Sequence, residues 1–169
     1  MCCNKSLSLI IIVIILFVIF SCIIFYFCSN TVSNSNILQA INSQVQLSNS
    51  STAIIFDTNR IQKGDAISHD NSNSDINIVK PGIYLVNYSV TGSLETGNSP
   101  TFFELSLYQD NVLVPNSFLS SLVIPSGQSM SLSGSTIIEV NNVSNISLMA
   151  NSASDIIYSD ATVSIIELW

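Results

Sequence analysis

The part of the chain after residue 28 contains no cysteine, because all four cysteines lie at Cys2, Cys3, Cys22 and Cys28. A disulfide in the C-terminal part is therefore excluded, and this part must be stabilised by packing or by oligomerisation. Glycine is also scarce, with only six residues and no Gly-X-Y run. That scarcity excludes a collagen-like stalk.

Charge is scarce as well, and most of it is negative. Charged residues make up 9% of the 169 residues, and the formal net charge is −7. After residue 28 the basic residues are Arg60, Lys63 and Lys80, so contact with nucleic-acid phosphates would be opposed by repulsion. The one histidine, His69, is the only base available to a serine triad, and no Gly-x-Ser-x-Gly element is present. We expect His69 in a surface strand or loop, and we expect no enzymatic activity, no cofactor and no nucleic-acid partner.

A single long hydrophobic run lies near the N-terminus. Residues 7–27 carry no charge and show no polar stripe. As a helix rising about 1.5 Å per residue, this run would span about 30 Å, the thickness of the bilayer core. We predict a transmembrane signal anchor over residues 7–28. A cleaved signal peptide or lipoprotein processing at Cys22 fits less well, because the run is long and stays apolar after Cys22.

Charge near this run predicts its orientation. Lys5 precedes the run and the next basic residue is Arg60, so the positive-inside rule places the N-terminus in the cytoplasm and the C-terminal part outside. Cys2 and Cys3 are either acylated at the inner leaflet or free thiols. The predicted organisation is a cytoplasmic tail (1–6), the anchor (7–28), a spacer or short stalk (29–51) and a folded domain (52–169).

Residues 37–47 leave two interpretations open. Leu38, Ile41 and Val45 are spaced by three and four, as in a short helical segment of a parallel bundle. The run is too short to form a stable helix alone. The alternative is a linker that is only partly helical.

From about residue 52 the hydrophobic period becomes two. Short alternating runs are separated by turn signals such as Pro81-Gly82 and Asn141-Asn142. Eight to ten such strands without a helical period predict an all-β domain, a β-sandwich or a barrel, and a last strand in a central position favours a jelly roll or Greek key among these. The last run, residues 161–169, has apolar residues on both faces and is expected to be a central strand.

Several expected strands carry apolar residues on both faces. The core face of residues 83–90 holds Tyr84, Val86, Tyr88 and Val90, and the opposite face begins with Ile83 and Leu85. A strand buried on one face needs only one apolar face, and no helical pattern remains in the domain to cover the other. We therefore predict a homotrimer in which neighbouring subunits cover these second faces. The interface candidates are Ile83, Leu85, Phe102, Ile166 and Leu168.

Acidic residues supply the remaining candidates. Oxygen ligands that would suit calcium cluster between two expected strands, at Asp57, Asp65, Asp70 and Asp75. Their spacing matches no EF-hand, and an ordinary polar loop is the favoured interpretation. Three glutamates within apolar strands face either solvent or the three-fold axis, and we favour solvent for Glu104, Glu139 and Glu167.

The stretches "IIFDTN…GDAISH…INIVKPGIYLVNYSV", "SSLVIPSG" and "ISLMANSAS…ATVSIIELW" together resemble a known domain. They are similar to the C-terminal domain of collagen-like exosporium glycoproteins of spore-forming bacteria, one of the tumour-necrosis-factor and complement-type jelly rolls. The resemblance covers residues 52–169 and implies a homotrimeric head of two packed sheets per subunit. Because the collagen run is missing, the predicted anchor and spacer take its place, which favours a membrane-tethered head on a spore or cell surface.

Two functions follow as hypotheses. The first is a membrane-anchored trimeric surface protein that displays its head for structural or adhesive interactions with an unknown surface protein or glycan. The second is a carbohydrate-binding, lectin-like module. A lectin site would need exposed aromatic side chains in a concave patch, for which the candidates are Tyr108, Phe118 and Tyr158.

Overall fold

The computed structural model describes residues 15–22, 35–48, 51–94, 101–124 and 128–169. Residues 15–22 form a helix, and among the described residues no helix is long and apolar enough to cross a membrane. The predicted anchor (7–28) extends beyond the described residues on both sides, and the predicted tail (1–6) lies outside them. Both therefore stay predictions. Ser35–Trp169 form one compact unit of their own.

The described residues of this unit form thirteen strands. They are β1 (Ile37–Asn42), β2 (Gln46–Ser48), β3 (Thr52–Ala53), β4 (Thr58–Lys63), β5 (Ile67–His69), β6 (Ile76–Ile78), β7 (Gly82–Leu94), β8 (Thr101–Gln109), β9 (Val112–Leu113), β10 (Leu119–Ile124), β11 (Ser129–Val140), β12 (Ser144–Ser152) and β13 (Ile156–Glu167). The number exceeds the expected eight to ten because β2, β3 and β9 are very short and β1 lies in the predicted spacer.

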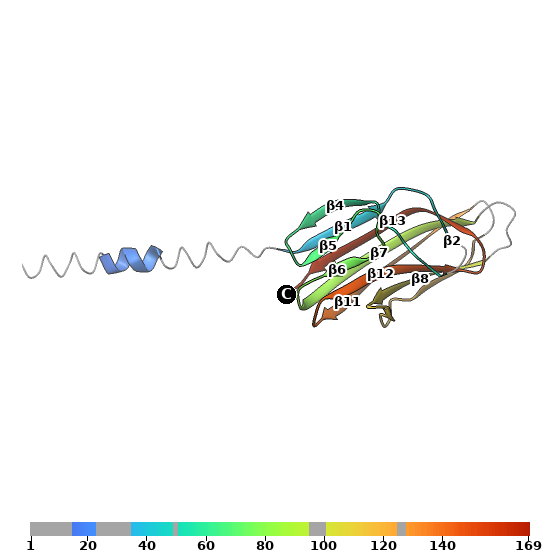
Figure 1. The fold of residues 1–169 in the computed structure, drawn as a ribbon. Helices are drawn as coiled ribbons and strands as arrows, with labels where there is room; N and C mark the ends of the chain where they lie inside the picture. Colours follow the sequence, from blue (N-terminus) through green and yellow to red (C-terminus); the bar gives the residue numbers. More distant parts are fainter. Residues whose placement is uncertain (1–14, 23–34, 49–50, 95–100, 125–127) are drawn as a thin grey trace, which may run out of the picture. The chain divides into compact units, whose positions relative to one another are not determined.

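The strands form two antiparallel sheets that face each other (Figure 1). The first sheet has the order β11-β7-β13-β1-β4, with β2 added to β13. The second has the order β10-β8-β12-β6-β5, with β3 and β9 added to β12 and β8. Sequence neighbours such as β7 and β8 lie in different sheets, as in a jelly roll. The predicted all-β jelly-roll sandwich is confirmed.

The core lies between the sheets and follows the period of two. In β7 the side chains of Tyr84, Val86, Tyr88 and Val90 are buried, as predicted. The second sheet contributes Phe103, Leu105 and Leu107 of β8 in the same alternating manner. The predicted central position of the last strand is also confirmed, because β13 pairs with β7 on one side and with β1 on the other.

The predicted boundary at residue 52 is too late. β1 lies inside the first sheet between β13 and β4, so residues 37–42 are neither stalk nor helix. Leu38 and Ala40 point into the core with no exposed surface, while Ile37 and Ile41 are half-buried on the outer face. Residues 37–42 therefore form a strand and not the helix that the spacing of three and four indicated, because a strand here completes two hydrogen-bonded ladders. The domain begins at Ser35.

Asn36 fixes the point where the chain enters the domain. Its Oδ1 accepts hydrogen bonds from the backbone N–H groups of Asp65 at 2.8 Å and Ala66 at 2.9 Å. Its Nδ2 donates to Oε2 of Glu167, and the N–H of Glu167 donates to the carbonyl of Asn36 at 3.0 Å. Gly64 has φ +77°, and a Cβ there would lie 1.9 Å from Asn36 Oδ1. The start of β1, the turn after β4 and the end of β13 are thus joined.

We expect Gly134→Ala to destabilise the domain by about 1–3 kcal/mol, the usual cost of overpacking a core. An added Cβ would lie 2.6 Å from both Cζ and Oη of Tyr88. The ring cannot move aside freely, because its hydroxyl donates to the carbonyl of Ser117 at 2.7 Å. Urea unfolding of residues 35–169 measures the change. Ser133→Ala on the exposed face of the same strand is the control, and equal stability of the two variants would contradict the assigned contact.

Candidate interaction surface

A row of apolar side chains crosses the outer face of the first sheet. The ladder registers place Ile137 beside Leu85, Leu85 beside Ile166, and Ile166 beside Ile37. These four residues come from the neighbouring strands β11, β7, β13 and β1, so their side chains form one continuous line. Ile37, Leu85 and Ile166 are half-buried and Ile137 is 60% exposed. We call Ile37, Leu85, Ile137 and Ile166 the apolar row.

The structure brings together four of the five predicted interface residues. Leu85 and Ile166 belong to the apolar row, and Ile83 and Leu168 adjoin it, with the N–H of Leu168 donating to the carbonyl of Ile83 at 2.8 Å. Phe102 does not join them, because it lies on the outer face of β8 in the second sheet. Sequence reasoning missed Ile37 and Ile137 because the register that places them beside Leu85 and Ile166 depends on strands far apart in the chain.

The apolar row continues around the edge of the sandwich into a groove of about 370 Å³. Ile137 and Ile138 of β11 line one side, and the hairpin of β8 and β9 lines the other. The hairpin contributes exposed Val112 and Leu113. Gln109 Nε2 bridges the groove by donating to the carbonyl of Glu139 at 3.1 Å. We call this the edge groove, and it gives the domain a second apolar surface that differs in shape from the flat row.

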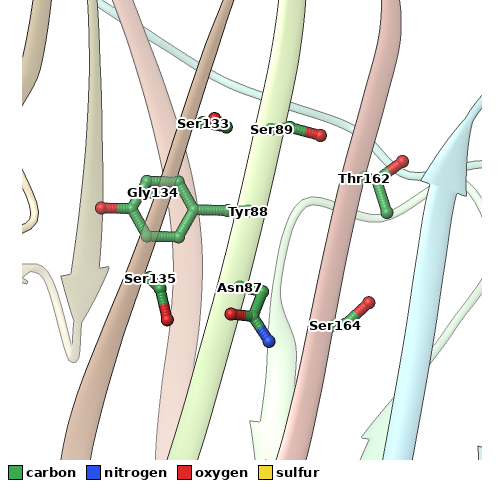
Figure 2. A pocket seen from close by; sticks show the side chains of 8 residues that line it. All are labelled: Asn87, Tyr88, Ser89, Ser133, Gly134, Ser135, Thr162 and Ser164. Atoms are coloured by element: carbon green, nitrogen blue, oxygen red, sulfur yellow. The ribbon is translucent and has the colours of Figure 1, made fainter.

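Beside the apolar row the same face becomes polar. Figure 2 shows side chains from β7, β11 and β13 around a shallow groove of about 470 Å³. Small hydroxyl and amide groups line it, at Asn87, Ser89, Ser133, Ser135, Thr162 and Ser164. Gly134 has no side chain here, and the ring of Tyr88 lies against it (Figure 2). The groove has no charged or fully exposed aromatic lining residue, so it lacks the groups that would fix a small ligand strongly.

We expect Asp110, at the lip of the edge groove, to make the domain sensitive to acid. Its Oδ1 accepts the N–H of Asn145 at 2.8 Å and its Oδ2 accepts the hydroxyl of Ser144 at 2.7 Å. These two bonds, that of Asn145 first, lower the pKa of Asp110 below its ordinary value of 3.8. A lowered folded-state pKa stabilises the fold above the unfolded-state pKa, and this stability is lost as the pH falls through the folded-state pKa.

The test is a series of thermal melts of residues 35–169 between about pH 6 and about pH 3, a range that spans the ordinary carboxyl pKa. Asp110→Asn is expected to lower Tm near pH 6 and to flatten the loss of Tm in acid. Asparagine suits the site, where φ is 51°, because it tolerates the left-handed region. The exposed Asp70→Asn variant controls for net charge. A variant with the same acid slope as the parent protein would contradict the role of Asp110.

The predicted calcium candidates are not brought together. Asp57 Oδ2 accepts the N–H of Ser43 at 3.0 Å, and this bond lowers the pKa of Asp57 most. Asp65 forms an exposed ion pair with Lys80, which lowers the pKa of Asp65. In the part of the chain that the structure describes, no three His, Cys, Asp or Glu side chains lie close enough to hold a metal ion. Asp57 and Asp65 are instead the partners of Ser43 and Lys80.

The expectation that His69 lies at the surface is wrong. Its side chain is buried at the end of β5 and meets the ring of Phe56 edge-on, with centroids 6.0 Å apart. Nδ1 lies 2.7 Å from Asn59 Oδ1, and Nε2 lies 3.1 Å from the carbonyl of Asn73. The ring therefore links β4, β5 and the turn at Asn73. Both ring nitrogens thus face oxygens of the fold itself, which gives His69 a structural role.

The three glutamates within apolar strands avoid the core. Glu139 is exposed, while Glu104 and Glu167 are half-buried. Glu104 Oε2 accepts from Asn151 Nδ2 at 2.7 Å, and Glu167 is the partner of Asn36. Glu104 and Glu139 lie on the outer faces of their strands, whereas Glu167 lies at the end of β13 and is part of the structure around Asn36. That they face solvent and not the three-fold axis stays a prediction.

The aromatic candidates for a lectin site do not share a patch. Tyr158 is buried in the core, where its ring packs against Phe103 with centroids 5.7 Å apart. Tyr108 is half-buried on β8, and Phe118 is exposed in the segment before β10. The prediction of Tyr158 as an exposed platform is wrong, because the period of two turns it inward beside Ile156.

The fold has relatives among solved structures. No protein-family model matches the chain, and no curated protein matches it in sequence. The globular domain of zebrafish complement 1qA is similar with a TM-score of 0.59 and 9% identity, over 79% of this chain and 98% of that one. Murine APRIL at pH 8.5 is similar with a TM-score of 0.56 and 8% identity, over 79% of this chain and 99% of that one. The likeness shows the fold alone, a two-sheet jelly-roll sandwich that this chain shares with these two domains.

Proposed function

We propose that this chain is a membrane-anchored surface protein that displays a homotrimeric jelly-roll head for structural or adhesive interactions. The observation that carries the proposal is the apolar row, which lies on the outer face of a sheet whose inner face already packs the core. Large apolar patches on a folded domain mark interaction sites. The anchor is residues 7–28 with a cytoplasmic N-terminus, and the head is displayed as in the exosporium glycoproteins that the sequence resembles.

A three-fold ring suits the two apolar surfaces. A closed ring needs head-to-tail contacts, in which a patch on one subunit fits a different patch on the next. The apolar row and the edge groove are two such patches, one flat and one concave, and Ile137 belongs to both. In the proposed trimer the groove packs through Leu113 against the row around Leu85 of the neighbouring subunit, and Val112, beside the turn at Asp110 and Asn111, stays outside this contact. The adjoining polar groove then faces the axis, where water satisfies its hydroxyl groups.

Display as a trimer has a functional consequence. Three heads on short tethers present three copies of the same outer surface in one direction. Weak contacts to a surface protein or a glycan then add through effective concentration, which can raise avidity by about 10²–10⁴ over a single contact. This mechanism needs no catalytic group, in agreement with the structural role of His69.

The trimer proposal predicts that Leu85→Glu converts residues 35–169 from a trimer into a monomer. A carboxylate in the middle of the apolar row would be buried without a partner in the interface, at a cost of several kcal/mol per subunit. Sedimentation equilibrium and light scattering at micromolar concentration measure the mass.

Phe102→Glu is the matched control for this experiment. Phe102 is 50% exposed on the outer face of the other sheet, so its replacement adds the same charge away from the proposed interface. The control is expected to stay trimeric. A monomeric parent fragment would overturn the proposed function, and dissociation by Phe102→Glu alone would move the interface to the second sheet.

A further inference from the structure

The start of β1, where the chain enters the domain, lies at the same end of the sandwich as the ends of several other strands. Ile37 at the start of β1 lies opposite Ile166 near the end of β13, and the N–H of Ile83 donates to the carbonyl of Trp169 at 2.9 Å. Val140 at the end of β11 lies opposite Gly82. The turn between β8 and β9 is at this end too, because the N–H of Asp110 donates to the carbonyl of Asn145 at 2.8 Å. We call this end the base (Figure 1).

The base carries exposed apolar side chains at separate tips. Trp169 is 78% exposed, Val112 and Val143 are each 68% exposed, and Val79 is 42% exposed. Trp169 is not on a loose backbone, because its carbonyl and the N–H of Leu168 are both hydrogen-bonded to Ile83. The backbone that carries this exposed indole is thus held against β7. Such an indole gains from an environment that is apolar at one side and wet at the other.

We propose that the base rests on the interfacial region of the bilayer and that Trp169, Val112 and Val143 are its lipid contacts. The proposal depends on the membrane anchor in the proposed function. Six residues, 29–34, separate the predicted anchor from Ser35, and they reach at most about 20 Å when fully extended. The point where the chain enters the base therefore lies within that distance of the membrane surface. Tryptophan is enriched at this depth of membranes.

The charge of the base indicates which lipid headgroups it can contact. The whole chain has a formal net charge of −7, and at the base the carboxylates of Asp65, Asp110, Glu139 and Glu167 outnumber the cations Lys63 and Lys80. An anionic surface would repel this end of the head, whereas a zwitterionic surface would not. We therefore assign the base to zwitterionic lipid. In the proposed trimer the three bases point the same way, because rotation about an axis normal to the membrane leaves that direction unchanged.

The test uses the single tryptophan of the chain as its own reporter. Residues 35–169, a compact unit with its own core, are attached through an N-terminal histidine tag to phosphatidylcholine vesicles containing a small fraction of nickel-chelating lipid. We expect a blue shift of Trp169 emission and a roughly twofold quenching by phosphatidylcholine brominated near the headgroup, as for a side chain at the interface. Phosphatidylserine vesicles are expected to give less quenching.

Two double variants separate the base from other apolar surfaces. Val112→Ser with Val143→Ser is expected to remove most of the quenching. Val45→Ser with Leu47→Ser changes two exposed apolar residues beyond the other end of β1. This second variant is expected to leave the quenching of Trp169 unchanged. Unaltered Trp169 emission on vesicles that carry the protein overturns the inference. A blue shift that depends on protein concentration without lipid also overturns it, because the base would then contact another copy.

Failure here is distinguishable from failure of the proposed function. The fragment lacks the anchor, so its mass by light scattering reports the trimer independently of the lipid result. Alkaline extraction of the full chain from membranes reports the anchor. Release of the full chain into the soluble fraction would overturn the anchor and this inference together, whereas retention with unquenched Trp169 would overturn the lipid contact alone.

Discussion

A fragment that begins at Thr52 will not fold, whereas a fragment that begins at Ser35 will. Removing residues 35–51 deletes β1 from the interior of the first sheet, so β13 and β4 both lose a hydrogen-bonded neighbour. It also removes Leu38 and Ala40 from the core. Loss of one buried leucine side chain alone costs about 2–5 kcal/mol. A domain of this size has a free energy of unfolding of only about 5–15 kcal/mol. The combined loss of the two ladders and the core side chains is expected to exceed it.

Circular dichroism and amide NMR spectra of the two fragments measure this difference. The fragment from Ser35 is expected to give dispersed amide signals and a cooperative melt. The fragment from Thr52 is expected to be disordered or aggregated, because the exposed edges of β13 and β4 invite pairing with other chains. A cooperative melt of the shorter fragment would show that β1 is dispensable and that the domain boundary lies where the sequence pattern alone puts it.

Tyr84→Ala is expected to destabilise residues 35–169 by about 3–5 kcal/mol, as truncation of a large buried aromatic does. Tyr84 has no exposed surface, and its hydroxyl donates to the carbonyl of Lys80 at 2.9 Å. Burial, and after it the nearby Glu167, raise the pKa of Tyr84 above 10.0, so the ring stays neutral at physiological pH. Both parts of Tyr84 thus stabilise the domain. The apolar ring packs in the core, and the neutral hydroxyl holds the segment before β7.

Urea unfolding of a series of variants separates the two contributions. Tyr84→Phe keeps the ring and is expected to cost about 0.5–1.5 kcal/mol, the usual net value of one hydrogen bond. Tyr108→Ala, at a half-buried position on β8, controls for loss of a tyrosine at a less enclosed site and is expected to cost less than Tyr84→Ala. An unfolding midpoint for Tyr84→Ala equal to that of the parent would contradict the face assignment of β7.

The parts of the fold that could be predicted are those in which the alternation within a single strand identifies its buried and its exposed face. Tyr84, Val86, Tyr88 and Val90 alternate so strongly that their burial followed from the sequence. The sequence of β1 shows no such clear alternation. The buried positions in β1 and directly before it include the polar Asn42 and Asn36 beside Leu38, and the outer positions include the apolar Ile37. The alternation is therefore masked, and the spacing of Leu38, Ile41 and Val45 imitates a helix.

The candidate surface was predicted in part for a related reason. An apolar second face is visible within one strand, which is how Ile83, Leu85, Ile166 and Leu168 were found. The alignment of Ile137 and Ile37 with them is a property of the ladders, and no single strand contains it. The same limit explains His69, whose burial depends on Asn59 and Asn73 meeting both ring nitrogens. Local sequence gives no sign of those partners.

The hydrogen bonds of Asn36 have a mechanical consequence. They fasten the first residues of the domain to the end of β13 and to the turn after β4. A pull along β1 on the first residues of the domain therefore acts across two ladders at once, those with β13 and β4. Because ladder hydrogen bonds lie perpendicular to the strands, such a pull shears all of them together instead of peeling them one at a time. If the head is tethered as proposed, it would resist such a pull as a whole and yield only when both ladders slip together.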